Sequence, residues 1–184
     1  MSSELRPHPQ APHPGAELLS HYKFCFGCGS DHPSGLHLRM VVVDGLSVIG
    51  TFQVSSDHQG ATGIIHGGIL AAAFDEVLGA LSWLLLKPAV TGRLEVDFRV
   101  PVPVGATVTI SAAVDSIERR KVRATGVGRI ADGTVVAEAA GLFIQVPLEH
   151  FEMHREKHRE KHREKQGDAA VGADAVTDTE DVAS

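Results

Sequence analysis

Three residues, His66-Gly67-Gly68, open an apolar stretch that carries an acid, Asp75, nine positions after the histidine. A glycine pair at the start of a helix leaves backbone N–H groups unpaired, and the positive end of the helix dipole lies behind them. Such a site binds an anion, or a carbonyl oxygen that becomes one during a reaction. A carboxylate within an apolar helix is costly unless something uses it. The donor site and the buried acid together predict acyl-transfer or hydrolytic chemistry.

The stretch after the glycines has two faces when it is read as a helix at 100° per residue. One face is bulky and apolar, so that a sheet can cover it, and it comprises Leu70, Phe74, Val77, Leu81 and Leu85. The opposite face is small apart from the acid, and it comprises Gly68, Ala71, Ala72, Asp75, Gly79 and Ser82. Small residues let another backbone approach closely. The helix alone also fits a plainer interpretation, in which the acid lies at the edge of the core and pairs with an arginine.

The composition indicates a soluble globular protein. The 184 residues suffice for one domain with a substantial core, and 43% hydrophobic and 22% charged residues are ordinary for that class. A net charge of −6 argues against nucleic acid or an anionic membrane as partner. The run from Ile69 to Leu86 is nearly long enough to span a bilayer, but Asp75 and Glu76 near its middle argue against this. The N-terminal stretch shows no secretory signal, and we expect a cytoplasmic protein.

Residues 1–20 are rich in proline and lack apolar periodicity, so we expect a disordered arm. The folded domain is expected over residues 21–150, with one helix over 67–86. Strand-like runs are expected at 36–43, 46–54, 90–100, 106–118, 121–131 and 134–146. Because the turns between them are short, neighbouring strands should be antiparallel. The pattern predicts an α+β fold in which an antiparallel sheet of about six strands wraps around one long central helix.

Two polar segments follow this domain. Residues 151–166 include three copies of His-Arg-Glu-Lys over 154–165, a segment that is polar all round, which predicts at best a solvated helix. His154, His158 and His162 share one face of it, which fits either weak capture of a transition metal or a low-complexity spacer. The acidic residues 167–184 are expected to form a disordered tail.

Further motifs stand at fixed distances from the first. They are His58-Gln59-Gly60, Gly63-Ile64-Ile65 directly before His66, Thr91 sixteen positions after Asp75, and Phe98-Arg99-Val100-Pro101. An earlier segment reads Cys25-Phe26-Gly27-Cys28-Gly29 and then Pro33-Ser34-Gly35-Leu36. With the β-β-α-β-β-β-β order, residues 22–147 resemble the hotdog-fold acyl-CoA thioesterases, in the phenylacetate-degradation (PaaI-like) branch. The resemblance implies the hotdog fold.

The resemblance also implies hydrolysis of an acyl-CoA or related thioester to a free acid and a thiol, with no cofactor. The backbone N–H of Gly67 would bind the thioester carbonyl oxygen, and His66 would help to fix that loop. Asp75 would be the base that activates water, or the nucleophile itself. Thr91 would orient the water or hold Asp75. These roles are coherent, because the reaction needs a carboxylate beside the carbonyl and donors where the oxyanion forms.

Other functions on the same fold stay open. One is a non-catalytic module that binds acyl-CoA or an acyl carrier; Asp75 with Thr91 favours the hydrolase, because a binder has no need of a desolvated acid. Another is a dehydratase or hydratase, which usually needs an acid–histidine pair placed differently. The candidate substrate-binding residues are His58, Gln59, Gly68, Arg119, Arg120 and Lys121. The three cations stand at a predicted turn, where they meet coenzyme A phosphates or merely solubilise a hairpin tip.

The spacing of the two main groups predicts a partner. Gly67 and Asp75 are eight residues apart, roughly 12 Å along one helix. One chain cannot easily supply both to the same carbonyl. Two antiparallel helices that touch along their small faces would bring the acid of one beside the glycines of the other, in a two-fold dimer. The resembling family is built on such dimers, often paired into tetramers, and we expect a homodimer or a dimer of dimers.

Cys25 and Cys28 form a CxxC pair with three interpretations. A structural zinc site needs two more ligands, and His32 and His37 are the nearest candidates. A redox pair normally heads a helix in a thioredoxin-like context, which is not predicted here. The third interpretation, favoured by the resemblance, is a turn packed against the domain. We therefore expect no metal.

Overall fold

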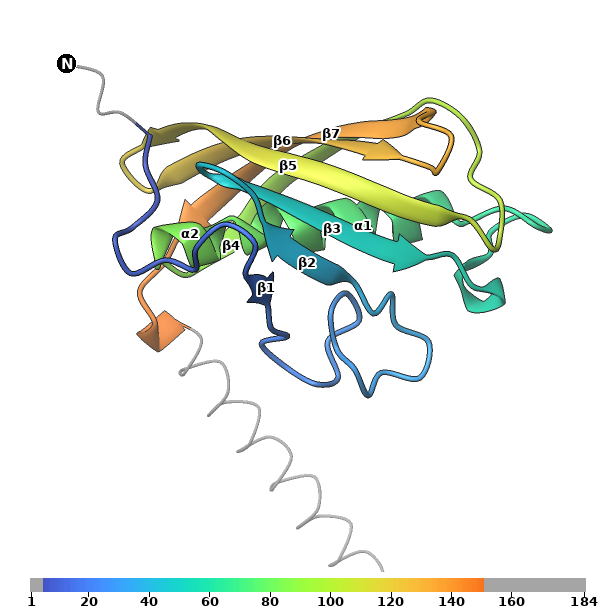
Figure 1. Cartoon of the computed structure of the whole chain (residues 1–184), viewed down its shortest axis with the longest axis horizontal. Helices are drawn as coiled ribbons and strands as arrows, with labels where there is room; N and C mark the ends of the chain where they lie inside the picture. Colours follow the sequence, from blue (N-terminus) through green and yellow to red (C-terminus); the bar gives the residue numbers. More distant parts are fainter. Residues whose placement is uncertain (1–4, 151–184) are drawn as a thin grey trace, which may run out of the picture. The chain divides into compact units, whose positions relative to one another are not determined.

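A seven-stranded antiparallel sheet dominates residues 5–150, the part of the chain that the computed structural model describes (Figure 1). The strands are β1 (Glu17–Leu18), β2 (Arg39–Val42), β3 (Ser47–Gln53), β4 (Ala89–Phe98), β5 (Thr107–Glu118), β6 (Lys121–Arg129) and β7 (Val135–Gln145). Their spatial order is β1-β2-β3-β5-β6-β7-β4, and every neighbouring pair is antiparallel. The α+β fold is confirmed, and the six expected strands lie within three residues of their expected bounds.

Burial alternates along the strands that form the middle of the sheet. On β3, Val48 and Phe52 are buried between neighbours that are half-buried or exposed, and on β5 the same holds for Val108 and Ile110. This is the two-residue period of a strand with one face against a core. The inward residues of these strands meet the central helix.

Helix α1 (Gly67–Ala80) contacts strands β3 to β7, and its bulky face packs against the sheet. Phe74 and Val77 on that face are fully buried, as the sequence pattern predicts. Glycines on the sheet make this close packing possible. A Cβ on Gly50 would lie only 2.3 Å from Cγ2 of Val77, and one on Gly128 would lie 3.0 Å from Cζ of Phe74.

The end of the helical region differs from the single helix expected over 67–86. Helix α1 ends at Ala80, and a separate short helix α2 (Ser82–Leu85) follows. Leu86 then adopts the left-handed conformation with φ of 48°, which terminates the helical run two residues before Pro88. By length and composition alone, Gly67–Leu85 is long and apolar enough to cross a membrane, but half of the most apolar window is buried in this domain.

The segment before the first long strand corrects one expectation. Part of the predicted disordered arm forms β1, which pairs with β2 through Glu17 opposite Val41, and Leu18 is buried. The His8 N–H also donates to the Leu84 carbonyl at 2.8 Å. Backbone pairing of two residues requires no apolar periodicity, so the pattern could not indicate it. The compact unit that contains the sheet ends at Val146, and the predictions for residues 151–184 lie outside the described residues.

Candidate active site

The N-terminus of α1 presents one unused backbone donor. His66 is the N-cap, and its Nδ1 accepts the Gly68 N–H at 2.9 Å. Its carbonyl accepts the N–H of Ile69 at 3.0 Å. Within residues 5–150, the N–H of the exposed Gly67 has no acceptor. His66 thus orders the first turn and leaves the Gly67 donor at the positive end of the helix dipole, where a carbonyl oxygen can bind.

The second group is a hydrogen-bonded pair on α1 and β4. The Thr91 hydroxyl donates to Oδ1 of Asp75 at 2.7 Å, which orients the carboxylate and leaves Oδ2 without a partner among the described residues. The β4–β7 register shifts between Thr91 and Arg93, a bulge centred on Gly92. A bulge turns the neighbouring side chains, which explains how a strand residue meets the helix here.

The exposure of Asp75 corrects the expectation of a buried acid. In the single chain its side chain is half-buried, beside the half-buried Ala71, Ala72 and Gly79. The small face of the helix is therefore open. A full desolvation of the carboxylate needs a second surface laid on this face.

His58 and Gln59 stabilise the loop that precedes α1. His58 is buried, its Nδ1 accepts the Ser55 N–H at 3.0 Å, and its Nε2 lies 3.3 Å from the Gly35 carbonyl. Gln59 accepts the Gly63 N–H at 2.7 Å. The His58 carbonyl in turn accepts the His66 N–H at 2.8 Å. Their polar groups thus bind loop backbone, and contact with substrate stays a prediction for both.

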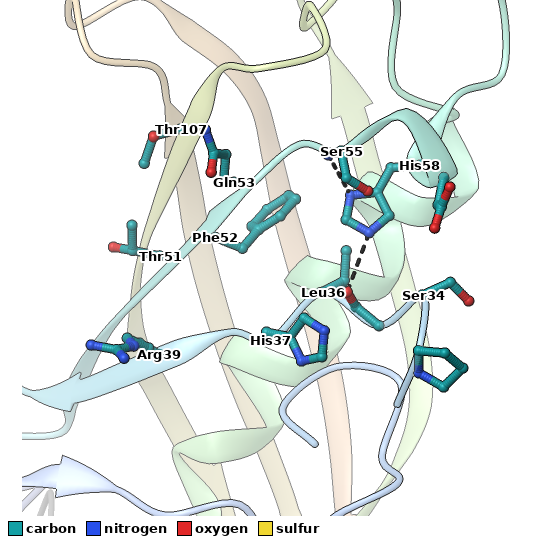
Figure 2. Close-up of a pocket in the computed structure, with 13 residues that line it drawn as sticks. Ser34, Leu36, His37, Arg39, Thr51, Phe52, Gln53, Ser55, His58 and Thr107 are labelled. Atoms are coloured by element: carbon teal, nitrogen blue, oxygen red, sulfur yellow. Dashed lines mark hydrogen bonds between the residues drawn. The ribbon is translucent and has the colours of Figure 1, made fainter. Parts of the chain in front are cut away.

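A pocket of about 530 Å³ lies between the segment around Leu36 and strand β3, and Figure 2 shows the side chains that line it. His58, Phe52 and Arg39 are among them. Neither Gly67 nor the Asp75–Thr91 pair contributes to this pocket. This pocket is thus separate from the candidate catalytic groups of the same chain.

The three predicted cations stand together at the β5–β6 turn, and all are exposed. Lys121 pairs with Ile144 on β7, and Ile144 pairs with Val90 on β4, the residue before Thr91. Two strand spacings, about 10 Å, therefore separate the base of this turn from the Thr91 end of β4. The cations and the Asp75–Thr91 pair lie at the same end of the sheet.

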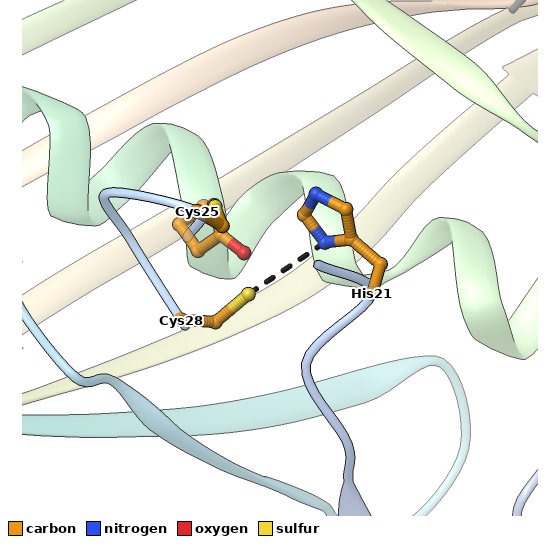
Figure 3. A group of neighbouring side chains, drawn as sticks. His21, Cys25 and Cys28 are labelled. Atoms are coloured by element: carbon orange, nitrogen blue, oxygen red, sulfur yellow. Dashed lines mark hydrogen bonds between the residues drawn. The ribbon is translucent and has the colours of Figure 1, made fainter. Parts of the chain in front are cut away.

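A second cluster, missed by the sequence reasoning, forms around the cysteine pair. The Cys25 thiol donates to Oε2 of Glu76 at 3.5 Å, and Sγ of Cys28 lies 3.6 Å from Nδ1 of His21 (Figure 3). The neighbours expected from sequence lie elsewhere: Nδ1 of His37 lies 2.8 Å from the Gly29 carbonyl, and the His32 ring packs on Phe26.

The environment of Cys28 makes its thiol a poor nucleophile in the metal-free chain. Burial first, and then the neighbouring Glu76 carboxylate, raises the pKa of this thiol to about 12. A thiol with such a pKa is protonated at neutral pH, whereas redox cysteines are thiolates. This argues against a redox pair.

Comparison with known proteins identifies the domain. Residues 62–137 match the thioesterase superfamily. Over 96 residues the chain is 35% identical to acyl-coenzyme A thioesterase THEM4 of Xenopus laevis, a match over 52% of this chain and 43% of that protein. A solved thioesterase superfamily protein superposes with a TM-score of 0.63 at 28% identity, covering 67% of this chain and 61% of its own. The domain has the hotdog fold of these structural neighbours, and its residues 62–137 match the thioesterase superfamily model.

The PaaI-like branch is also represented among the structural neighbours. A mutant of the phenylacetic acid degradation protein PaaI from Thermus thermophilus superposes with a TM-score of 0.55 at 26% identity, over 60% of this chain and 95% of that one. The resemblance inferred from the motifs is thereby confirmed. The chain matches less than half of the length of the THEM4 relative, so the match to it concerns the hotdog domain alone.

Proposed function

We propose that this protein hydrolyses an acyl-CoA thioester. The observation that carries the proposal is a carboxylate, Asp75, oriented by Thr91 at 2.7 Å on the helix whose first N–H, that of Gly67, is unused. These are the two groups that acyl transfer to water requires. The relationship to an acyl-coenzyme A thioesterase supports coenzyme A as the thiol.

In the proposed reaction the Gly67 N–H donates to the thioester carbonyl oxygen and stabilises its negative charge as attack proceeds. Asp75 takes a proton from water while the water oxygen bonds to the carbonyl carbon. The carbon–sulfur bond then breaks, and the coenzyme A thiolate takes the proton from Asp75. In the alternative route, Asp75 itself attacks and water hydrolyses the resulting anhydride. After one turnover in ¹⁸O water, label in the Asp75 carboxylate indicates this second route.

We also propose that each site is shared by two subunits of a homodimer. The Gly67 N–H and the Asp75 carboxylate lie on one unbroken helix, roughly 12 Å apart along its axis, too far for one carbonyl. Strand β4 supports the same conclusion: it is an edge strand of ten residues, mostly exposed, and edges of this length are normally covered. A two-fold partner that covers β4 and the small face of α1 would complete both sites.

The first test measures thiol release from a panel of acyl-CoA substrates. We expect Asp75→Asn to lower kcat at least roughly 100-fold while the fold stays intact, as for loss of a catalytic carboxylate. The matched control is Asp115→Asn, since Asp115 also accepts a threonine hydroxyl, that of Thr125, at 2.9 Å on β5. A folded Asp75→Asn variant with near-normal turnover refutes the catalytic role. Saturable coenzyme A binding without turnover would leave the non-catalytic binding module.

The second test mixes two inactive variants, Asp75→Ala and Gly67→Pro, under conditions of subunit exchange. In a mixed two-fold dimer, one site contains both substitutions and the other contains neither. Half of the dimers are mixed at equal concentrations, and each has one intact site of two. Activity should therefore recover to about a quarter of the wild-type value. Proven exchange without recovery refutes the shared site.

A further inference from the structure

Four potential metal ligands from distant parts of the sequence meet beside α1. They are His21, Cys25 and Cys28 from the segment before β2, and Glu76 from the helix. One ligand atom from each lies within 4.8 Å of all the others. Cys28 is buried and His21 is exposed, so the cluster opens to solvent on the histidine side, which gives an ion a path of entry.

We propose that these residues bind a structural zinc ion. Tetrahedral zinc with ordinary bond lengths to sulfur, nitrogen and oxygen places neighbouring ligand atoms about 3.3–3.8 Å apart. Two edges of the cluster already have such lengths: 3.6 Å from Cys28 Sγ to His21 Nδ1, and 3.5 Å from Cys25 Sγ to Glu76 Oε2. The remaining distances of at most 4.8 Å need a contraction of about 1 Å, within reach of side-chain rotation.

The types of ligand atom in the cluster favour zinc over other metal ions. Two thiolates in a C-x₂-C spacing with an imidazole nitrogen are typical of zinc sites, whereas calcium and magnesium bind all-oxygen sites. Binding would release the protons of both thiols, because only thiolates are ligands. The two thiolates and the Glu76 carboxylate then carry three negative charges against two positive ones on the ion.

Glycines shape the loop around this cluster. A Cβ on Gly27 would lie 2.4 Å from Oε2 of Glu76, so a side chain at this position would displace that carboxylate from its present place. A Cβ on Gly29 would lie 2.5 Å from the Cys25 nitrogen, and the Gly29 N–H donates to the Cys25 carbonyl at 2.9 Å. The tight turn holds both sulfurs toward α1. The site departs from the sequence-based expectation of a packed turn without metal, and its other ligands are not His32 and His37.

Such an ion would tie the entry segment to α1 one residue away from Asp75. Glu76 points about 100° around the helix from Asp75, so the ion would not reach the reacting atoms. Its role would be to fix the entry segment against the catalytic helix. Because the ligands alone carry this inference, it stands independently of the proposed function.

The test uses the full-length chain titrated with cobalt(II) and then with zinc. We expect one equivalent of cobalt to give the near-ultraviolet thiolate-to-cobalt absorption, and zinc to displace it. Histidines of the 154–162 repeat cannot produce this band, so it reports on the cysteines alone. With zinc bound, both thiols should resist a thiol reagent, and a strong chelator should release them.

Two variants and one control assign the ligands. Cys28→Ser should abolish the cobalt band, and Glu76→Gln should weaken zinc binding at least roughly tenfold, since an amide oxygen is a poorer ligand. His32→Gln, which removes a nearby histidine outside the cluster, should change neither. If Cys28→Ser fails to fold, the wild-type titration and Glu76→Gln decide the matter on their own. The proposal is overturned if wild-type protein with cobalt lacks the thiolate absorption band, or if a Cys25–Cys28 disulfide forms despite excess zinc. It is also overturned if Glu76→Gln and His32→Gln lose the same amount of zinc affinity.

Discussion

Replacing Gly67 by proline removes a single N–H from the candidate site and little else. Gly67 is the first residue of α1, where proline is well tolerated because its nitrogen has no intrahelical partner. His66 before it has φ of −70° and ψ of 131°, the extended conformation that a residue before proline prefers. A Cβ at position 67 would meet the Phe98 ring at 3.5 Å, an ordinary contact. The variant should therefore fold.

The catalytic effect of this change follows from the loss of one oxyanion donor. Such a loss costs roughly 10²–10³ in kcat, about 2.7–4 kcal/mol of transition-state stabilisation. The donor binds the charged oxygen more strongly than the ground-state carbonyl, so kcat should fall much more than KM rises. Gly67→Ala is the matched control, because it adds a Cβ in the same space but keeps the N–H. It should stay within about threefold of wild-type activity.

The assay is thiol release at saturating acyl-CoA, with circular dichroism and Tm measured on the same samples. A folded Gly67→Pro variant with more than a third of wild-type kcat would refute the donor role. Equal losses of kcat in Gly67→Pro and Gly67→Ala would show that the added side-chain atoms, and not the missing N–H, lower the activity. Either outcome removes Gly67 from the proposed mechanism.

Three other changes test the arrangement around this donor. Thr91→Val should lower kcat roughly 10- to 100-fold through loss of one hydrogen bond to a carboxylate, whereas Thr125→Val, its counterpart on β6, should not. Arg119→Glu with Arg120→Glu should raise KM for acyl-CoA roughly tenfold at low salt, less at high salt, with kcat unchanged; an unchanged KM excludes these cations from binding. Deleting residues 151–184 should shift Tm by less than about 2 °C and leave activity unchanged, since no apolar periodicity follows Phe151; a larger drop contradicts this.

The sequence predicted those parts of the structure that depend on local pattern. The start of the helix at Gly67 follows from the glycine pair and the apolar stripe after it, and the strands follow from alternation. Strand β1 and the break after Ala80 were missed, because two paired residues and one altered helical turn leave no periodic signal.

Contacts between residues far apart in the sequence could be predicted only where a family resemblance pointed to them. Asp75 and Thr91 were paired by a family resemblance; the bulge at Gly92 that permits their contact depends on register with β7, which no local pattern encodes. In the sequence, Glu76 stands out only as a second acid within the apolar run from Ile69 to Leu86. Its contact with Cys25 became visible only with the entry segment packed on α1, since 51 residues separate the two.

Helix α1 is now accounted for on all but one side. The sheet covers the bulky face around Phe74, and the cysteine segment covers the side of Glu76. Among the described residues, the small face is only partly covered, with Asp75 half-buried on it. Exclusion of water strengthens the interaction of a carboxylate with a developing charge. Since residues 5–150 leave this face partly exposed, we propose that the surface that completes the site belongs to a second copy of the chain. The exposed β4 edge beside Thr91 is where a second copy of the same domain would attach.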